Sequence, residues 1–140
     1  MLQRALQAIG LTILLTTHAL SAQTTQVKAR EPVSGGRTLS EWIRDLKAEA
    51  PQTRNSAAYE IAGMGLDAVR AVPALIEALD DPSPVVRFPV TVALGEIGPG
   101  AKAAIPRLQQ MVAEEINDEI AASARRALKH IDPSAVPATD

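Results

Sequence analysis

The stretch AVPALIEALDDPSPVVRFPVTVALGEIGPGA, residues 71–101, contains two helical patterns separated by a short polar turn. In both halves the large apolar residues recur at the period of a helix with one buried face, which argues against the alternation of a strand. Ser83 and Pro84 place a cap residue and then a proline at the start of the second helix. The apolar positions are Val69, Val72, Leu75, Ile76 and Leu79 in the first pattern, and Val86, Val90, Leu94 and Ile97 in the second.

The same two-helix pattern occurs on both sides of this stretch, at a shift of 33 residues. Gly65 then falls on Gly98 and Pro73 on Pro106, while one extra residue near 114–117 lengthens the last unit. Because two helices cannot bury an apolar stripe alone, such units stack and share a core. We therefore predict an all-α fold, an α-solenoid of three two-helix repeats, over residues 38–132. The units are 38–65, 66–98 and 99–132, with helices expected at 38–48, 51–64, 67–80, 84–97, 101–115 and 118–131.

Two runs within the central unit, residues 71–87 and 92–101, resemble HEAT repeats of the short bacterial type. The resemblance covers about residues 39–132, including a proline in the first helix of the second and third units. It implies that an aspartate of the inner turn, here Asp81, and an arginine early in the second helix, here Arg87, belong to a ladder of pairs along the stack.

The end units depart from this pattern, so we expect the ladder to be incomplete. Unit one keeps Arg54, but Glu49 and Ala50 stand near its aspartate site, and unit three has Glu114 and Ala121 at the two sites. A second departure is Pro89, which lies inside the second helix of the central unit. A proline there removes a backbone hydrogen bond and costs up to about 3 kcal/mol, unless the helix kinks or starts late.

Composition excludes several kinds of chemistry. The 140 residues include no cysteine, which excludes disulfides, thiolate metal sites and cysteine nucleophiles. The net charge of −2 argues against general nucleic-acid binding, which needs a basic surface. His130 is the only histidine after residue 22, and the acidic group at 114–119 lacks the layout of a calcium loop. We therefore expect no catalytic residue, no metal site and no cofactor.

Both termini differ in composition from the repeats. Arg4, an apolar run over 9–20 and small residues up to Ala22 are typical of a secretory signal peptide over residues 1–22, cut near Ser21 or Ala22. An uncleaved anchor and a plain N-terminal helix remain alternatives. Cleavage would make the protein secreted or periplasmic, with membrane contact only during export. Residues 23–37 are predicted to be a flexible linker and residues 133–140 a disordered tail.

The resemblance implies that the second helices line the concave surface of the solenoid. Residues on the side opposite the core stripe would then form a binding surface: Tyr59, Phe88, Val92, Arg125 and Arg126. Apolar anchors beside a basic end suit a protein or peptide partner. The alternatives are that neighbouring helices cover Phe88 and Val92, or that Pro89 rotates these two residues inward.

The main hypothesis is therefore an exported, non-catalytic scaffold that binds a protein or peptide. The alternative is an accessory subunit or small-ligand-binding module that supports an exported enzyme. The first unit opens with Leu39 and Trp42 and has no evident polar cap, so a homo-oligomer is also considered.

Overall fold

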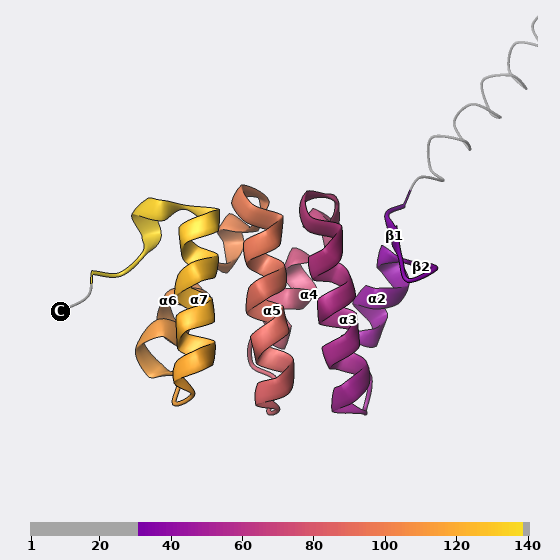
Figure 1. Ribbon diagram of the computed structural model, residues 1–140, viewed down its shortest axis with the longest axis horizontal. Coiled ribbons are helices and arrows are strands. Elements are labelled where there is room, and N and C mark those ends of the chain that lie inside the picture. Colours follow the sequence, from indigo (N-terminus) through magenta and orange to yellow (C-terminus); the bar gives the residue numbers. More distant parts are fainter. Residues whose placement is uncertain (1–30, 139–140) are drawn as a thin grey trace, which may run out of the picture. The chain divides into compact units, whose positions relative to one another are not determined.

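The computed structural model describes residues 31–138, so the predicted signal peptide and residues 23–30 of the predicted linker lie outside the described residues. This part of the chain is an all-α solenoid preceded by a two-stranded hairpin (Figure 1). None of the helices within residues 31–138 has the length and apolar character needed to span a membrane. The elements are β1 (Val33–Ser34), β2 (Arg37–Thr38), α2 (Leu39–Asp45), α3 (Pro51–Met64), η1 (Gly65–Ala71), α4 (Val72–Ala78), α5 (Pro84–Ile97), η2 (Gly98–Ala104), α6 (Ile105–Glu114), α7 (Asp118–Ile131) and η3 (Pro133–Ala135).

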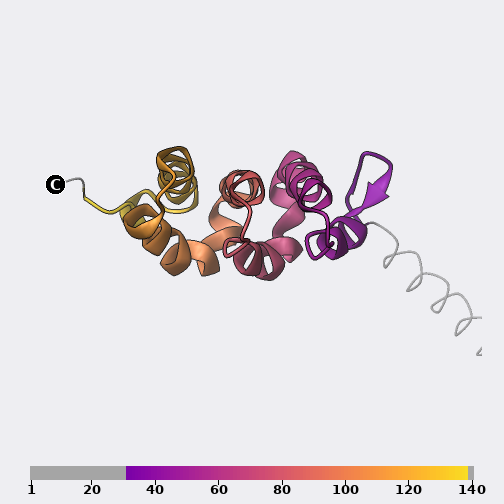
Figure 2. The same cartoon turned by 90° about the horizontal axis from the view of Figure 1, so that it is seen from below.

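The helices form two layers, with α2, α4 and α6 in one and α3, α5 and α7 in the other (Figure 2). Helix α5 lies between α3 and α7 and packs against both, and each of these three helices also packs against the first helix of its own pair. In Figure 2, α5 is set back relative to α3 and α7. We call the surface of α3, α5 and α7 that faces away from the other layer the second-helix face. The predicted all-α solenoid is confirmed.

The predicted bounds of the second helices agree with the structure, whereas those of the first helices need correction. Segments 67–80 and 101–115 each divide into a 3-10 segment and a shorter α-helix that starts one residue before Pro73 or Pro106. Proline has no amide N–H and fits only the first turn of an α-helix, so these prolines mark new starts and not interior positions. The segment expected at 38–48 is α2, which ends at Asp45.

Small residues allow the second helices to pack closely. Ile61, Leu94 and Leu128 occupy equivalent places in α3, α5 and α7 and are fully buried. Between α5 and α7, a Cβ atom added at Gly95 would lie only 3.2 Å from the Cα atom of Ala127. The contact therefore depends on the missing side chain at Gly95, which explains how an aromatic-poor sequence still forms a dense interior.

Pro89 is buried inside α5, and the helix continues through it from Pro84 to Ile97 without starting late. The carbonyl that loses its helical donor is that of Val85, four residues earlier. The side-chain amide of Asn55 in α3 donates a hydrogen bond of 2.6 Å to this carbonyl oxygen. A neighbouring unit thus replaces the bond that Pro89 removes.

Residues 32–37 form most of a hairpin and not the end of a flexible linker, which corrects the prediction for these residues. The indole N–H of Trp42 donates to the Ser34 carbonyl oxygen at 3.0 Å, and the Arg37 guanidinium lies 4.2 Å from the ring centroid. The Ser34 hydroxyl also donates to Glu60 at 2.6 Å. Trp42 is only 8% exposed beside the hairpin, and the homo-oligomer stays a prediction. Strands of two residues are too short to show a periodic pattern in the sequence.

The prediction of a disordered tail also needs correction for residues 133–138, because these residues lie against the last helix pair. Residues Pro133–Ala135 form η3, and Val136 packs against the core. The Gln109 side-chain amide donates to the Ala135 carbonyl oxygen at 2.8 Å. This short segment has no apolar period of its own, and its order comes from contacts with α6 and α7.

Candidate functional site

Two buried ion pairs join the units along the turns that precede the second helices. Arg54 of α3 makes two parallel hydrogen bonds to the Asp81 carboxylate, of 2.6 and 3.0 Å, and its Nη1 donates to the carbonyl oxygens of Ala48 and Glu49. The side chains of Arg54 and Asp81 are 13% and 6% exposed. Burial raises the pKa of Asp81, but hydrogen bonds from Arg54 and from the Ser83 amide outweigh this effect and leave the pKa below its ordinary value.

The second pair repeats this geometry one unit further on. Arg87 of α5 makes two hydrogen bonds to the Glu115 carboxylate, of 2.9 and 3.0 Å, which lower the pKa of Glu115. The expectation of an incomplete ladder with Glu114 at the acidic site is therefore wrong. One extra residue in the turn moves the acidic site to Glu115, and glutamate has one more methylene with which to reach the arginine. The interfaces on both sides of α5 are thus bridged in the same way.

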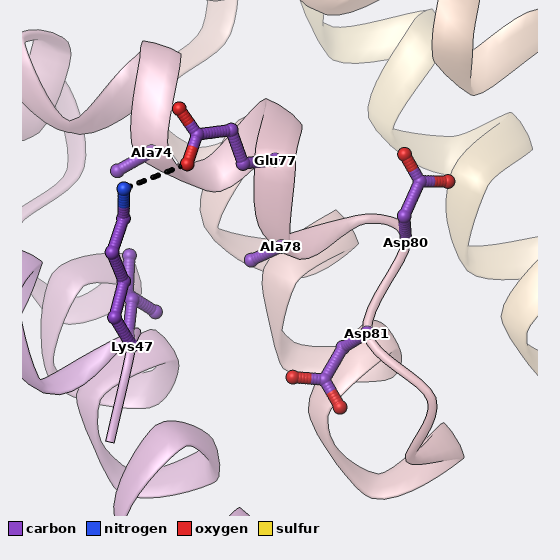
Figure 3. Close-up of a pocket in the computed structure, with 7 residues that line it drawn as sticks. Lys47, Ala74, Glu77, Ala78, Asp80 and Asp81 are labelled. Carbon is purple, nitrogen blue, oxygen red and sulfur yellow. Dashed lines mark ion pairs between the residues drawn. The ribbon is translucent and has the colours of Figure 1, made fainter. Parts of the chain in front are cut away.

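The opposite layer carries a shallow hollow of about 230 Å³ between α2 and α4 (Figure 3). Lys47 and Glu77 form an exposed ion pair of 2.8 Å across it. Of the two other carboxylates there, Asp80 pairs with Arg107 of α6 and Asp81 with Arg54. Each carboxylate in the hollow is already paired with an arginine or a lysine. We therefore assign the hollow to the packing of the stack and not to a binding site.

The second-helix face carries a groove of about 380 Å³ that crosses the first halves of α3 and α5 and the start of α7. It brings together Tyr59 and Phe88, as predicted from the sequence. Tyr59 is 49% exposed and Val85 is 56% exposed, while Phe88 is partly buried against the core. We call this the inner groove; its lining is Asn55, Tyr59, Pro84, Val85, Phe88, Asn117, Glu119 and Ile120.

The second halves of α5 and α7 line a separate pocket of about 80 Å³. It brings Val92 and Arg126 together, beside Glu96 and His130. Thr91 and Gly95, which line the same pocket as Val92, are buried between the helices. Because α7 packs closely on this side of α5, these small residues of α5 belong to the interface between the two helices.

Arg125 does not join the other predicted residues. Its guanidinium donates to the Pro137 carbonyl oxygen at 3.0 Å and so holds the C-terminal segment. In its place the groove includes Asn55, Val85 and Glu119, which the sequence analysis left out of the binding surface. Asn55 lies four residues before Tyr59 and Val85 three residues before Phe88, so the helical period could have placed both on the same face as the predicted residues.

A model of the family described as HEAT repeats matches residues 39–129 of this sequence. The chain belongs to the HEAT-repeat family. No curated protein and no solved structure gives a match. HEAT repeats generally mediate protein interactions, and the family is typically non-catalytic. The two arginine–carboxylate pairs and the paired helices are the structural counterpart of this match in residues 31–138.

No metal-binding group is found in the described HEAT units. Residues 31–138 hold no group of three or more histidine, aspartate or glutamate side chains placed to bind a metal ion. His130 is exposed at the end of α7, and Ser123, which shares its pocket, lies 2.6 Å from the Thr91 hydroxyl in a buried hydrogen bond. The geometry of the described residues favours contact with a partner surface at the inner groove.

Acid should destabilise the HEAT stack through the paired carboxylates. The pKa values of Asp81 and Glu115 are lower in the folded protein than in the unfolded chain, so their pairs stabilise the fold above about pH 4.5 and lose that effect as pH falls further. We expect the free energy of unfolding to be level from pH 7 to 5 and to fall below about pH 4. Urea titrations between pH 7 and pH 3 measure the free energy of unfolding and test this expectation. The double variant Asp81→Asn, Glu115→Gln should show a shallower fall, and an equally steep one would contradict the assignment.

Proposed function

We propose that this protein is an exported, non-catalytic HEAT-repeat scaffold that binds a protein or peptide partner through the second-helix face. The observation that carries the proposal is the inner groove, where the half-exposed side chains of Tyr59 and Val85 flank Phe88. Tyrosine is among the residues that supply most of the binding energy at protein interfaces, and the contacts around such an anchor exclude water from it. The polar groups Asn55 and Glu119 at the edges of the groove supply the hydrogen bonds and charge typical of an interface rim.

A small-ligand function has less support from the shape of the surface. Pockets that bind small molecules enclose most of the ligand, whereas the inner groove is an open trough across three helices. Such a trough matches a partner that supplies its own surface to complete the burial of Tyr59, Val85 and Phe88. Since the net charge is negative, nucleic acid is not the proposed partner.

Export rests on the composition of residues 1–22, which is typical of a signal peptide. The expected mature protein begins after Ser21 or Ala22 and carries the HEAT units outside the cytoplasm. Sequencing the N-terminus of the protein recovered from its native cells tests this. A start at Gln23 or Ala22 supports export with cleavage, and an intact Met1 in the mature protein contradicts it.

Loss of the groove side chains should abolish partner binding without unfolding the protein. We expect the triple variant Tyr59→Ala, Val85→Ala, Phe88→Ala to weaken partner capture at least about tenfold, because losing one hot-spot side chain costs about 2 kcal/mol or more and tenfold corresponds to about 1.4 kcal/mol. The measurement is quantitative co-purification from the native cells, with circular dichroism to confirm the helical content. The control is Leu66→Ala with Val69→Ala, two exposed apolar residues of η1 outside the groove. Equal capture by both variants would contradict the proposal.

A further inference from the structure

We infer that the inner groove takes an extended peptide segment about six residues long, in which an apolar side chain stands next to a basic one. This inference rests on the proposed function and specifies the partner of the same surface. Three features of the described residues carry it: the shape of the groove, its unused hydrogen-bonding groups and the sign of its charge.

The shape favours an extended chain over a helix. The groove crosses three second helices, and packed helix axes are about 8–10 Å apart, so its length is about 16–20 Å. An extended peptide covers that distance with about five or six residues. A partner helix is about 10–12 Å wide and presents several anchor side chains along one face. The volume of about 380 Å³ holds a few side chains and is too small for such a face.

An extended segment also needs hydrogen-bond partners for its backbone, and Asn55 offers them. One N–H of the Asn55 side chain is used by the Val85 carbonyl oxygen. The second N–H and the amide oxygen of Asn55 have no partner among residues 31–138. Asn55 and Val85 both line the groove beside Tyr59. Pro89 leaves the Val85 carbonyl oxygen without a helical donor.

The charge of the groove selects a basic partner. Glu119 is the one charged residue in its lining, and the exposed Asp118 is its neighbour in the chain. The Glu119 side chain is exposed and makes no ion pair with any residue in the described part of the chain. Arg87, the cation nearest in sequence to Phe88, is bound to Glu115, and Arg126 lies in the separate pocket with Glu96. A lysine or arginine next to the buried apolar side chain would therefore meet a free carboxylate, whereas an acidic residue would be repelled.

Three matched peptides test this with the full chain. Each peptide has eight residues with two adjacent leucines in the centre. The leucines are flanked by two lysines in the first peptide, by two glutamines in the second and by two glutamates in the third. Affinity is measured by fluorescence anisotropy. We expect the lysine peptide to bind most tightly and the glutamate peptide least. Glu119→Gln should weaken the lysine peptide about two- to fivefold and leave the glutamine peptide unchanged, because an exposed charge pair is worth only a small factor. Glu114→Gln removes the same charge from α6, outside the groove, and should change neither.

Several results would overturn the inference. They are tightest binding of the glutamate peptide, an equal response to Glu119→Gln and Glu114→Gln, or no binding of any of the three peptides. If in these cases the native partner is still lost with the triple groove variant, only the peptide class is wrong and the proposed function stands. If Tyr59→Ala and Phe88→Ala change neither peptide binding nor partner capture, the proposed function fails as well.

Discussion

Replacing Leu94 by alanine is expected to destabilise the protein by about 2–5 kcal/mol, the range for a leucine removed from a close-packed interior. Leu94 is fully buried in the middle of α5, which packs against both α3 and α7. A cavity there weakens two interfaces at once. Since small domains have a total stability of about 5–15 kcal/mol, the loss is a large fraction of the whole. Urea unfolding followed by circular dichroism measures it directly.

The matched control is Leu66→Ala, because Leu66 is 72% exposed in η1. A surface truncation of this kind should change the free energy of unfolding by less than about 0.5 kcal/mol. If Leu94→Ala and Leu66→Ala have similar effects, α5 is not the central helix of the stack, and the arrangement described above is wrong.

The second large effect is expected at the ion-pair ladder. Asp81→Ala leaves the mostly buried Arg54 guanidinium without its carboxylate and removes the acceptor for the Ser83 amide. Removing one partner of a fully buried pair costs about 3–5 kcal/mol. This pair is part-buried and Arg54 keeps its bonds to two carbonyl oxygens, so we expect a smaller loss, about 2 kcal/mol. Thermal unfolding and urea unfolding of the variant give the value.

A double-mutant cycle separates the pair from its surroundings. Asp81→Ala combined with Arg54→Met should cost less than the sum of the two single changes, because the double variant buries no unpaired charge. The control is Glu77→Ala, which breaks the Lys47 pair, whose side chains are about two-thirds exposed. That change should cost less than about 1 kcal/mol. Equal costs for Asp81→Ala and Glu77→Ala would show that the ladder does not hold the units together.

The second helices could be predicted from the sequence because their apolar stripes agree with the start signals at Pro51, Pro84 and Asn117, and two of them end at a glycine, Gly65 or Gly98. The first helices could not be bounded, because a proline at the second helical position looks the same as one in the interior until the preceding 3-10 segment is seen. The Glu115 partner of Arg87 was missed for a related reason. A single inserted residue in a turn changes which carboxylate reaches the arginine, and a repeat alignment assigns that residue only approximately.

The candidate site was predictable where it depends on helical period and not where it depends on packing. Tyr59 and Phe88 do share a groove, since both lie on the open side of their helices. Arg125 was assigned to the same face, but it binds the Pro137 carbonyl oxygen of a segment that the sequence marked only as a polar tail. The Asn55 amide is held by the Val85 carbonyl oxygen, which Pro89 leaves without a helical donor. The sequence shows that Pro89 removes this bond, but it does not show which neighbouring side chain replaces it.

Hydrogen–deuterium exchange of the full chain, with and without the partner co-purified by the wild-type protein, tests whether the second-helix face is the binding surface. We expect slower exchange on binding in residues 55–62, 85–92 and 119–126, with residues 72–78 of α4 unchanged. Slower exchange confined to α2, α4 and α6, with the second helices unaffected, would contradict it.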